Sequence, residues 1–372
     1  MKLLFWSSLS LIFFAYAGYP ICLYFRARFW PRPIQRSNIF PRVTIVLAVH
    51  NEEKNLPHKL RNLAALDYPS DRLEVIAVSD SSFDQTNNIL TAWQNISRRV
   101  VILPERRGKA NALNHGVARA RGEIICFTDA RQTIASDGLK KLVANFADPS
   151  VGCASGELIL REDPKVASSN GVGAYWRLEK QIRQWEGLAG STIGATGAFY
   201  AVRHDLLSPL PVGTILDDVY IPLQVARQGK RIVFDTKALA WDELTPSPKQ
   251  EFRRKVRTLA GNYQLLQLIP WVLTNSNPLR LQLICHKLLR LLVPFALVGA
   301  FVSAFWCRRG VYELALVFQV VFYGLAMLTG FRAKLGFLSR LSNISLAFIV
   351  LNTAATFALI HFITGRKAVW AK

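Results

Sequence analysis

The sequence lacks the spacing of cysteines that builds disulfide frameworks or zinc sites. Its 372 residues include only five cysteines, and three of these lie in or beside long apolar runs. Scattered cysteines of this kind are expected to be buried thiols, neither disulfide partners nor metal ligands. They are Cys22, Cys126, Cys153, Cys285 and Cys307.

Charge is absent from four long segments. Residues 3–25, 291–307, 314–331 and 341–365 contain no Asp, Glu, Lys or Arg. A helix needs about 20 apolar residues to cross the hydrocarbon core of a bilayer. The pattern therefore predicts an integral membrane protein with an N-terminal anchor over residues 1–28. A C-terminal membrane domain of about three helices is expected over residues 288–366.

An RNA-binding signature is also absent, although the net charge is +21. Much of the positive excess flanks the apolar segments, where it meets anionic lipid headgroups. We therefore expect membrane lipids, and no nucleic acid, as partners. The flanking residues are Lys287, Arg290, Arg332, Lys334 and Arg340.

The first apolar segment has two interpretations. Ala15-Tyr16-Ala17 resembles the cleavage site of a secretory signal peptide, but the apolar run continues to Phe25. Acids are absent from the arginine-rich stretch that follows, and such clusters remain in the cytoplasm. We favour an uncleaved anchor in a bacterial inner (plasma) membrane, with the N-terminus outside and the next domain in the cytoplasm. The arginines are Arg26, Arg28, Arg32, Arg36 and Arg42.

Residues 40–250 have an ordinary composition and alternate between strand and helix patterns. Continuous apolar runs predict buried strands at 43–49, 73–78, 99–103 and 124–128. Helical stretches are expected from Asn51, a possible N-cap, and over 110–120. This alternation is typical of an α/β domain with a mostly parallel sheet, in which ligands bind beyond the carboxyl ends of the strands.

Polar side chains follow three of the predicted strands. His50 and Glu52 come after the first, Asp80 after the second, and Asp129 with Arg131 after the fourth. Each residue alone could be a helix cap or a turn residue. Acids at the ends of several strands of one sheet instead favour a binding site at that edge.

Five motifs occur in the order found in family 2 glycosyltransferases. Residues 43–53 (VTIVLAVHNEE), 79–86 (SDSSFDQT), 108–114 (GKANALN), 122–132 and 216–229 carry the match. Over residues 40–260 the chain resembles the GT-A (nucleotide-diphospho-sugar transferase) catalytic domain, in the membrane-bound, polysaccharide-synthase-like branch. The resemblance implies an inverting transferase that moves a sugar, expected from a UDP-sugar, to a growing polysaccharide or a lipid-linked acceptor. A non-catalytic subunit that binds a nucleotide or a partner synthase is the alternative.

The resemblance also implies roles for residues on the donor side. Glu52 and Asp80 match positions that bind the nucleoside, and His50 stands where a ring can lie against the base. Lys109, in the GKANALN motif, joins the nucleotide-sugar-binding set. Asp129 matches the first acid of the Asp-x-Asp motif, which grips the ribose and the metal-bound diphosphate.

Arg131 occupies the position of the second acid in that motif. The expected cofactor is Mg²⁺ or Mn²⁺, held by Asp129 with phosphate oxygens and waters. The guanidinium of Arg131 can bind phosphate directly and so replace part of the metal's work. Alternatively, Arg131 pairs with an acid on a helix.

The acceptor side is assigned by resemblance as well. Asp217-Asp218 aligns with the family's acidic pair, which makes Asp218 the general base, although either acid could simply cap a helix over 219–228. Thr196 and Gly197 lie in a small-residue stretch near the acceptor end.

The resemblance also covers a basic stretch at the domain's end. Arg254 and Arg257 resemble cations that close over the diphosphate, while Thr258 stands in place of the family's tryptophan. The surrounding stretch, 251–275, alternates cations with apolar residues, a pattern that also fits an interfacial amphipathic helix.

Overall fold

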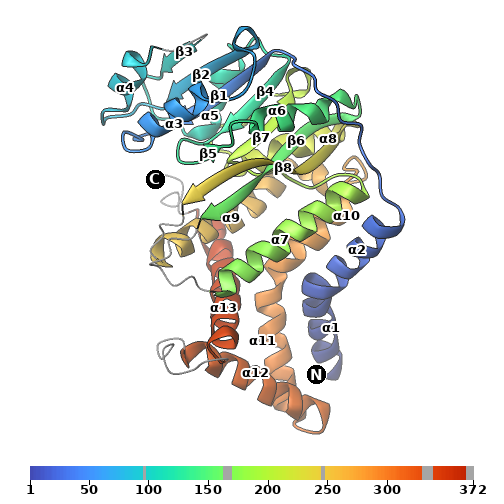
Figure 1. The fold of residues 1–372 in the computed structure, drawn as a ribbon. Coiled ribbons are helices and arrows are strands. Elements are labelled where there is room, and N and C mark those ends of the chain that lie inside the picture. The colour runs from blue at the N-terminus through green and yellow to red at the C-terminus, as the bar shows by residue number, and fades with distance from the viewer. Residues whose placement is uncertain (95–97, 162–169, 244–247, 329–337, 366–372) are drawn as a thin grey trace.

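The computed structural model describes all residues except 95–97, 162–169, 244–247, 329–337 and 366–372. An α/β domain is attached to a set of long helices that extend away from its sheet (Figure 1). The sheet has eight strands in the order β3-β2-β1-β4-β7-β6-β8-β5. Its two halves differ in strand direction.

The first half is the predicted parallel sheet. β1 (Val43–Val49) lies between β2 (Leu73–Ser79) and β4 (Ile124–Thr128), and β3 (Arg98–Ile102) pairs with β2, all in parallel. Every residue of β4 and all but Ala48 of β1 are buried, which explains their continuous apolar sequences. Parallel register carries the carboxyl ends of β1, β2 and β4 to one edge.

The second half adds three antiparallel pairs to the parallel sheet. β7 (Phe199–Arg203) runs antiparallel to both β4 and β6 (Val151–Arg161). β8 (Arg231–Glu243) is parallel to β6, and the short β5 (Thr133–Ile134) is antiparallel to β8. The sheet is therefore mixed in strand direction.

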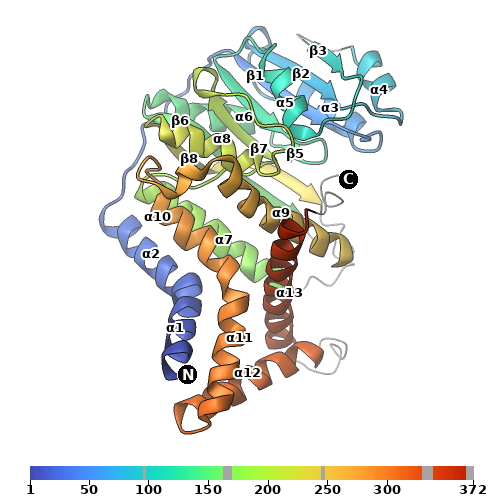
Figure 2. The ribbon, with the colours of Figure 1, turned by 180° about the vertical axis from the view of Figure 1, so that it is seen from behind.

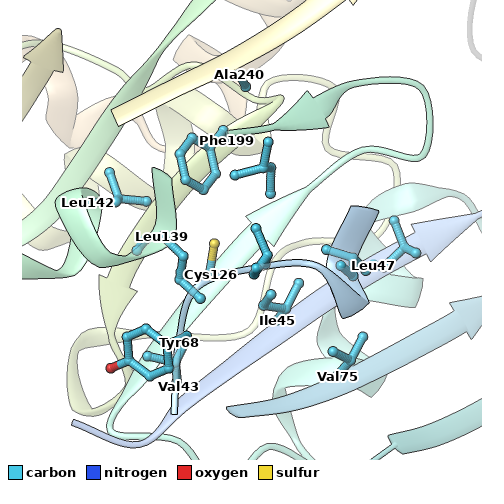
Figure 3. Packing of buried hydrophobic residues seen from close by; sticks show 14 of the residues in the cluster. Val43, Ile45, Leu47, Tyr68, Val75, Cys126, Leu139, Leu142, Phe199 and Ala240 are labelled. Atoms are coloured by element: carbon cyan, nitrogen blue, oxygen red, sulfur yellow. The ribbon is translucent and has the colours of Figure 1, made fainter. Parts of the chain in front are cut away.

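The core on one face of the sheet joins the two halves. Figure 3 shows Val43, Ile45 and Cys126 in the same packed layer as Phe199 of β7. Cys126 and Cys153 are buried thiols, as expected. Cys22 is exposed on its helix, and Cys285 and Cys307 are only partly buried, which corrects the expectation that all five are buried. The reason is that an apolar helix facing lipid places part of its side chains outside the protein core.

The helices of the catalytic domain flank this sheet. α3 (Leu56–Ala64) begins five residues after Asn51, so Asn51 is not its N-cap. Asn51 instead adopts a left-handed conformation (φ 55°), which asparagine tolerates, and accepts a hydrogen bond from Phe83 N. The other helices and short 3₁₀ turns are α4 (Thr86–Ala92), α5 (Lys109–Val117), α6 (Gly138–Val143), α7 (Asn170–Ala189), α8 (Asp217–Arg227), Ser70–Arg72, Ala144–Ala147 and His204–Leu206.

Three described helices are long and apolar enough to cross a membrane. The first, Lys2–Phe29, comprises α1 (Lys2–Phe13) and α2 (Tyr19–Phe29), joined by a π-turn at Phe14–Gly18. The second, Arg280–Cys307, comprises α10 (Arg280–Gln282), a π-turn (Leu283–Leu288) and α11 (Leu289–Cys307). The third, Leu341–Ile363, lies within α13 (Leu338–Ile363).

The remaining predicted span corresponds to the shorter α12 (Val311–Met327). In both ribbon views α12 lies obliquely at the end of α11 farthest from the sheet, and α13 returns toward the catalytic domain (Figures 1 and 2). The structure therefore offers two long helices after the catalytic domain, where about three spans were expected. Arg332 and Lys334 lie outside the described residues.

α9 (Pro248–Leu268) occupies most of the segment predicted to be an interfacial helix, and a 3₁₀ turn follows at Pro270–Leu273. Val256 and Ala260 pack against Ala354 and Ala358 of α13. α9 also approaches α8 closely, because a Cβ at Gly261 would lie 2.6 Å from Leu216 Cγ. Only glycine permits this contact without displacement of Leu216.

A buried polar cluster joins α7 to the membrane helices. Glu186 Oε1 accepts a hydrogen bond from Tyr19 Oη (2.7 Å) and lies 2.9 Å from His286 Nδ1. His286 Nε2 lies 2.9 Å from Glu179, which also binds Lys287 and Arg290. Because both ring nitrogens face carboxylate oxygens, the cluster holds either an imidazolium or a protonated carboxyl group. We call these residues the junction cluster.

Candidate active site

The carboxyl ends of β1 and β2 hold the predicted nucleoside side of the site. Asp80 is buried, and its carboxylate accepts hydrogen bonds from the backbone of Arg107 (3.0 Å) and Gly108 (2.7 Å). His50 Nδ1 lies 2.8 Å from Asp80 O. Glu52 binds Asn55 Nδ2 through its carboxylate. Asp80 thereby positions the turn before α5, in which Gly108 has φ 88°.

Lys109 connects the donor side to the acidic pair. It is the first residue of α5, and its Nζ lies 3.0 Å from Asp129 Oδ1 and 3.3 Å from Asp217 Oδ2. Burial lowers the pKa of this ammonium, but the attraction of Asp129 and Asp217 outweighs burial, so the pKa is raised. Lys109 is therefore a fixed cation. It unites carboxylates from two distant motifs in one cluster.

Asp217 and Asp218 begin α8, but Leu216 occupies its N-cap position and no side chain caps this end. The interpretation that one acid simply caps the helix is therefore wrong. Asp217 accepts a hydrogen bond of 3.4 Å from Tyr200 Oη. Asp218 lies beside Gly197, where an added Cβ would be 3.0 Å from its Oδ2.

The environment of Asp218 suits a proton acceptor. Burial, and then repulsion by Asp217, raise the pKa of the Asp218 carboxyl group to about 6, against the opposing attraction of Lys109. A base with a pKa near the working pH gives efficient proton transfer. Gly197 leaves open the space next to this carboxylate.

The Arg131 side chain lies against a strand, not a helix. Its guanidinium pairs with Asp242 Oδ2 on β8, and Gln132 Nε2 donates to the same oxygen at 3.0 Å. Asp242 is buried. The expected helix acid is therefore wrong. Sequence reasoning missed Asp242 because β8 as a whole was not predicted.

Lys59 is a second residue that sequence reasoning missed. It is fully buried on α3, and its Nζ donates to Thr128 Oγ1 (2.7 Å) and Gln132 O (2.8 Å). Thr128 Oγ1 in turn donates to Ala198 O (2.9 Å). Lys59 thus supports both the Asp129 loop and the loop that contains Gly197. The available signal was its position on the apolar face of α3, three residues after Leu56.

Thr196 is fixed beside a small cleft. Its backbone N donates to Ser155 Oγ (2.8 Å), and its Oγ1 accepts from Arg183 Nη1 (3.1 Å). Trp176 and Glu157 line the same cleft. The structure therefore places Thr196 and Gly197 on the side of Asp218 that faces α7.

Arg254 and Arg257 are exposed on α9. Arg254 pairs with Glu251 of the same helix at 2.8 Å. These two arginines therefore lie on a separate element from the Lys109 cluster. Their role at a diphosphate stays a prediction.

The oxygen donors of the site fit a divalent ion that shares its shell with phosphate. The Asp129 side chain is 39% exposed, against 6% for Asp217. Within the described ranges, no group of three or more His, Cys, Asp or Glu residues could hold an ion alone. Mg²⁺ and Mn²⁺ commonly bind through one or two carboxylates plus phosphate oxygens and waters. Asp129 offers such a carboxylate.

Comparison with known proteins identifies the class. Residues 44–210 match the family described as "Glycosyl transferase family 2". The chain is 26% identical to the probable glycosyltransferase YdaM of Bacillus subtilis over 319 residues, which covers 82% of this chain and 72% of that protein. Residues 44–210 thus form a family 2 glycosyltransferase domain, and the chain resembles enzymes of the membrane polysaccharide-synthase type.

Two further similarities bear on the fold and the branch. Poly-beta-1,6-N-acetyl-D-glucosamine synthase of Staphylococcus aureus is 26% identical over 229 residues, which covers 60% of this chain and 55% of that synthase. The match thus spans about half of the synthase. The mannosyltransferase PcManGT of Pyrobaculum calidifontis, solved with GDP-Man and Mn²⁺, superposes with a TM-score of 0.74 at 24% identity. That alignment covers 98% of this chain and 99% of PcManGT, which confirms the GT-A fold.

Proposed function

We propose that the protein is an inverting transferase that moves a sugar from a nucleotide-diphosphate sugar to a glycan or lipid-linked acceptor. The observation that carries this proposal is the Lys109 bridge, which joins the donor-side Asp129 to the acidic pair. The acceptor hydroxyl oxygen attacks the anomeric carbon, and the bond from that carbon to the diphosphate oxygen breaks. Asp218 takes the hydroxyl proton, and the nucleoside diphosphate leaves with the bonding electrons.

We assign the other site residues by their positions around this reaction. His50, Glu52 and Asp80 form the nucleoside side, while Lys109 offers a cation to the phosphates. Thr196 and Gly197 border the acceptor side of Asp218. We assign the exposed Arg254 and Arg257 of α9 to contact with the diphosphate.

A divalent ion would be held by Asp129 together with the diphosphate. When bound, it would neutralise the charge that develops on the leaving group. Support comes from the exposed Asp129 carboxylate and from the Mn²⁺ bound to PcManGT, which has the same fold. Lys109 supplies a second cation to this cluster, and Arg131 remains with Asp242.

The test is release of nucleoside diphosphate by the purified protein, assayed with UDP- and GDP-linked hexoses and N-acetylhexosamines. We expect a UDP-sugar to be the donor, because the relative from Staphylococcus aureus is named for an N-acetyl-D-glucosamine polymer. Release only from a GDP-sugar would correct the donor base. Tight binding of a nucleotide without any release would instead identify a non-catalytic subunit.

We further propose that the catalytic domain faces the cytoplasm of a bacterial inner membrane, because arginines follow the first membrane helix without intervening acids. A reporter fused after Arg42 should be cytoplasmic, and one at Arg309 external. Because α13 returns toward the catalytic domain (Figure 2), a reporter after Gly365 should be cytoplasmic. An external reporter after Gly365 would show that α12 crosses the membrane.

A further inference from the structure

A cavity of about 320 Å³ lies where the first membrane helix joins the catalytic domain. Its walls come from the linker after α2, the end of α7 and the start of β8. Arg32, Arg36 and Arg231 line it, together with the apolar Ile34, Leu188 and Phe234. One water occupies about 30 Å³ in the liquid, so the cavity has room for a phosphate and several attached atoms. Glycosyl transfer does not use this region.

The three arginines differ in how firmly they are held. Arg231 is fixed, because its Nη2 donates to Arg32 O (2.7 Å) and Gly187 O (3.4 Å), its Nη1 to Pro33 O (3.5 Å) and its Nε to Gly190 O (2.8 Å). Arg36 Nε donates to Asn145 Oδ1 (2.9 Å), and its side chain is 40% exposed. Arg32 is exposed. The cavity therefore has one fixed guanidinium and two that remain accessible.

Among the residues that the structure describes, no carboxylate belongs to the cavity lining itself, although Asp148 attracts Arg231 from outside it. Asp235, 3.7 Å from Arg36, already accepts hydrogen bonds from Asn145 Nδ2 and Lys237 N. Three guanidinium groups thus share one space, which favours an anion with several acceptor oxygens.

The level of the cavity relative to the membrane surface indicates which anion can reach it. The first membrane helix ends at Phe29, and the side chains of Phe29 and Trp30 are 61% and 71% exposed. Exposed aromatic residues at the end of a membrane helix mark the level of the lipid headgroups. The cavity begins two residues later, at Arg32. Its apolar wall also suits the glycerol and first acyl carbons of a lipid.

We propose that this cavity binds the headgroup of an anionic phospholipid, with its phosphate oxygens held by Arg32 and Arg36 and attracted by the charge of Arg231. The bound lipid would fasten the linker to α7, to which Arg32 N is already bonded through Leu188 O (2.8 Å). The catalytic domain would thereby be held at a defined height above the membrane. This proposal does not depend on the donor or the acceptor.

The test compares lipid retention by two double variants of the full-length protein. Arg32→Gln/Arg36→Gln removes two accessible cations of the cavity and leaves Arg231 in place. Arg26→Gln/Arg28→Gln is the matched control, because it removes two exposed cations from the last turn of α2. Each protein is equilibrated with mixed phosphatidylglycerol and phosphatidylcholine, purified in detergent, and its bound lipid is counted by native mass spectrometry.

We expect the native protein and the control to retain phosphatidylglycerol, and the cavity variant to retain about tenfold less, since each cation contributes measurably to headgroup attraction. Added phosphatidylglycerol should raise the Tm of the native protein and the control, but not that of the cavity variant. Equal loss from both variants would show diffuse attraction and overturn the site. Displacement of the lipid by inorganic phosphate alone would assign the cavity to a free anion. If the double variant does not fold, Arg32→Gln alone gives the same comparison.

Discussion

The two halves of the sheet are built on different rules. Strands β1, β2 and β4 are parallel, largely buried and followed by polar residues, so the sequence pattern and the site coincide there. Strands β5 to β8 are mixed in direction, yet they supply Asp242 and border Thr196. Short sequence motifs therefore predict the first half of the sheet, which holds the donor-side residues and is called the donor half below. The second half, which borders the acceptor side, depends on packing between distant segments.

The largest expected effect on activity is at Asp218, which lies where the two halves meet. Asp218→Asn should lower kcat about 100-fold or more and leave the Kd for the nucleoside diphosphate nearly unchanged, because it removes the general base alone. Asp217→Asn is the matched comparison, since it also weakens the hold on Lys109 and should reduce donor binding as well. If only Asp217→Asn abolished turnover, the base would have to be reassigned to Asp217.

The pH dependence of activity gives a second measure of the same residue. Burial and then Asp217 raise the pKa of Asp218 to about 6, and only the ionised carboxylate accepts a proton. Below that pH, kcat/KM should fall about tenfold per pH unit. The Asp218→Asn variant should lack this limb, and a native profile that is flat down to pH 5 would contradict the assignment.

Lys59 tests whether the donor half depends on a residue outside its motifs. Lys59→Met should lower kcat about tenfold, because the loops that carry Asp129 and Gly197 lose their common support. Stability should be unchanged or increased at neutral pH, since an apolar residue replaces a buried cation. Arg61→Met, an exposed change on the same helix, is the control. Equal activity of the two variants would restrict Lys59 to a structural role.

The same variant should change how stability depends on pH. Burial lowers the pKa of Lys59 to about 7 in the folded protein, against about 10.4 in an unfolded chain. Between these values the unfolded chain binds the extra proton, so the free energy of unfolding should rise from pH 7 to pH 10. Denaturant titrations of Lys59→Met should lack this rise. A parallel rise in both proteins would refute the assigned pKa.

The smallest expected effect concerns Arg131. Because its guanidinium pairs with Asp242, Arg131→Ala should chiefly reduce stability, by about 1–3 kcal/mol, through loss of a partner for a buried carboxylate. Nucleoside diphosphate binding should change less than about threefold. A larger loss of diphosphate than of nucleoside affinity would show instead that Arg131 leaves Asp242 to bind the donor.

The sequence predicted the elements whose pattern is local. The bounds of β1 and β4 agree residue for residue, because continuous apolar runs end at polar residues there. The start of α3 was misplaced, since the left-handed conformation of Asn51 depends on contact with Phe83, 32 residues away. Lys59 and Asp242 were missed for a related reason: their roles arise from partners about 70 and 111 residues distant.

The junction cluster has a consequence for the order in which the chain is synthesised. Tyr19 precedes Glu186 by 167 residues, and His286 follows Glu186 by 100. During translation, Glu186 therefore exists for about 100 residues without its imidazole partner. A nascent chain released in that interval holds a carboxyl group that is buried in the complete protein but lacks its hydrogen-bond partner His286. In such a product α7 should not pack stably against the membrane helices, and the chain should be sensitive to proteases. Stable packing of α7 therefore requires that synthesis has passed His286.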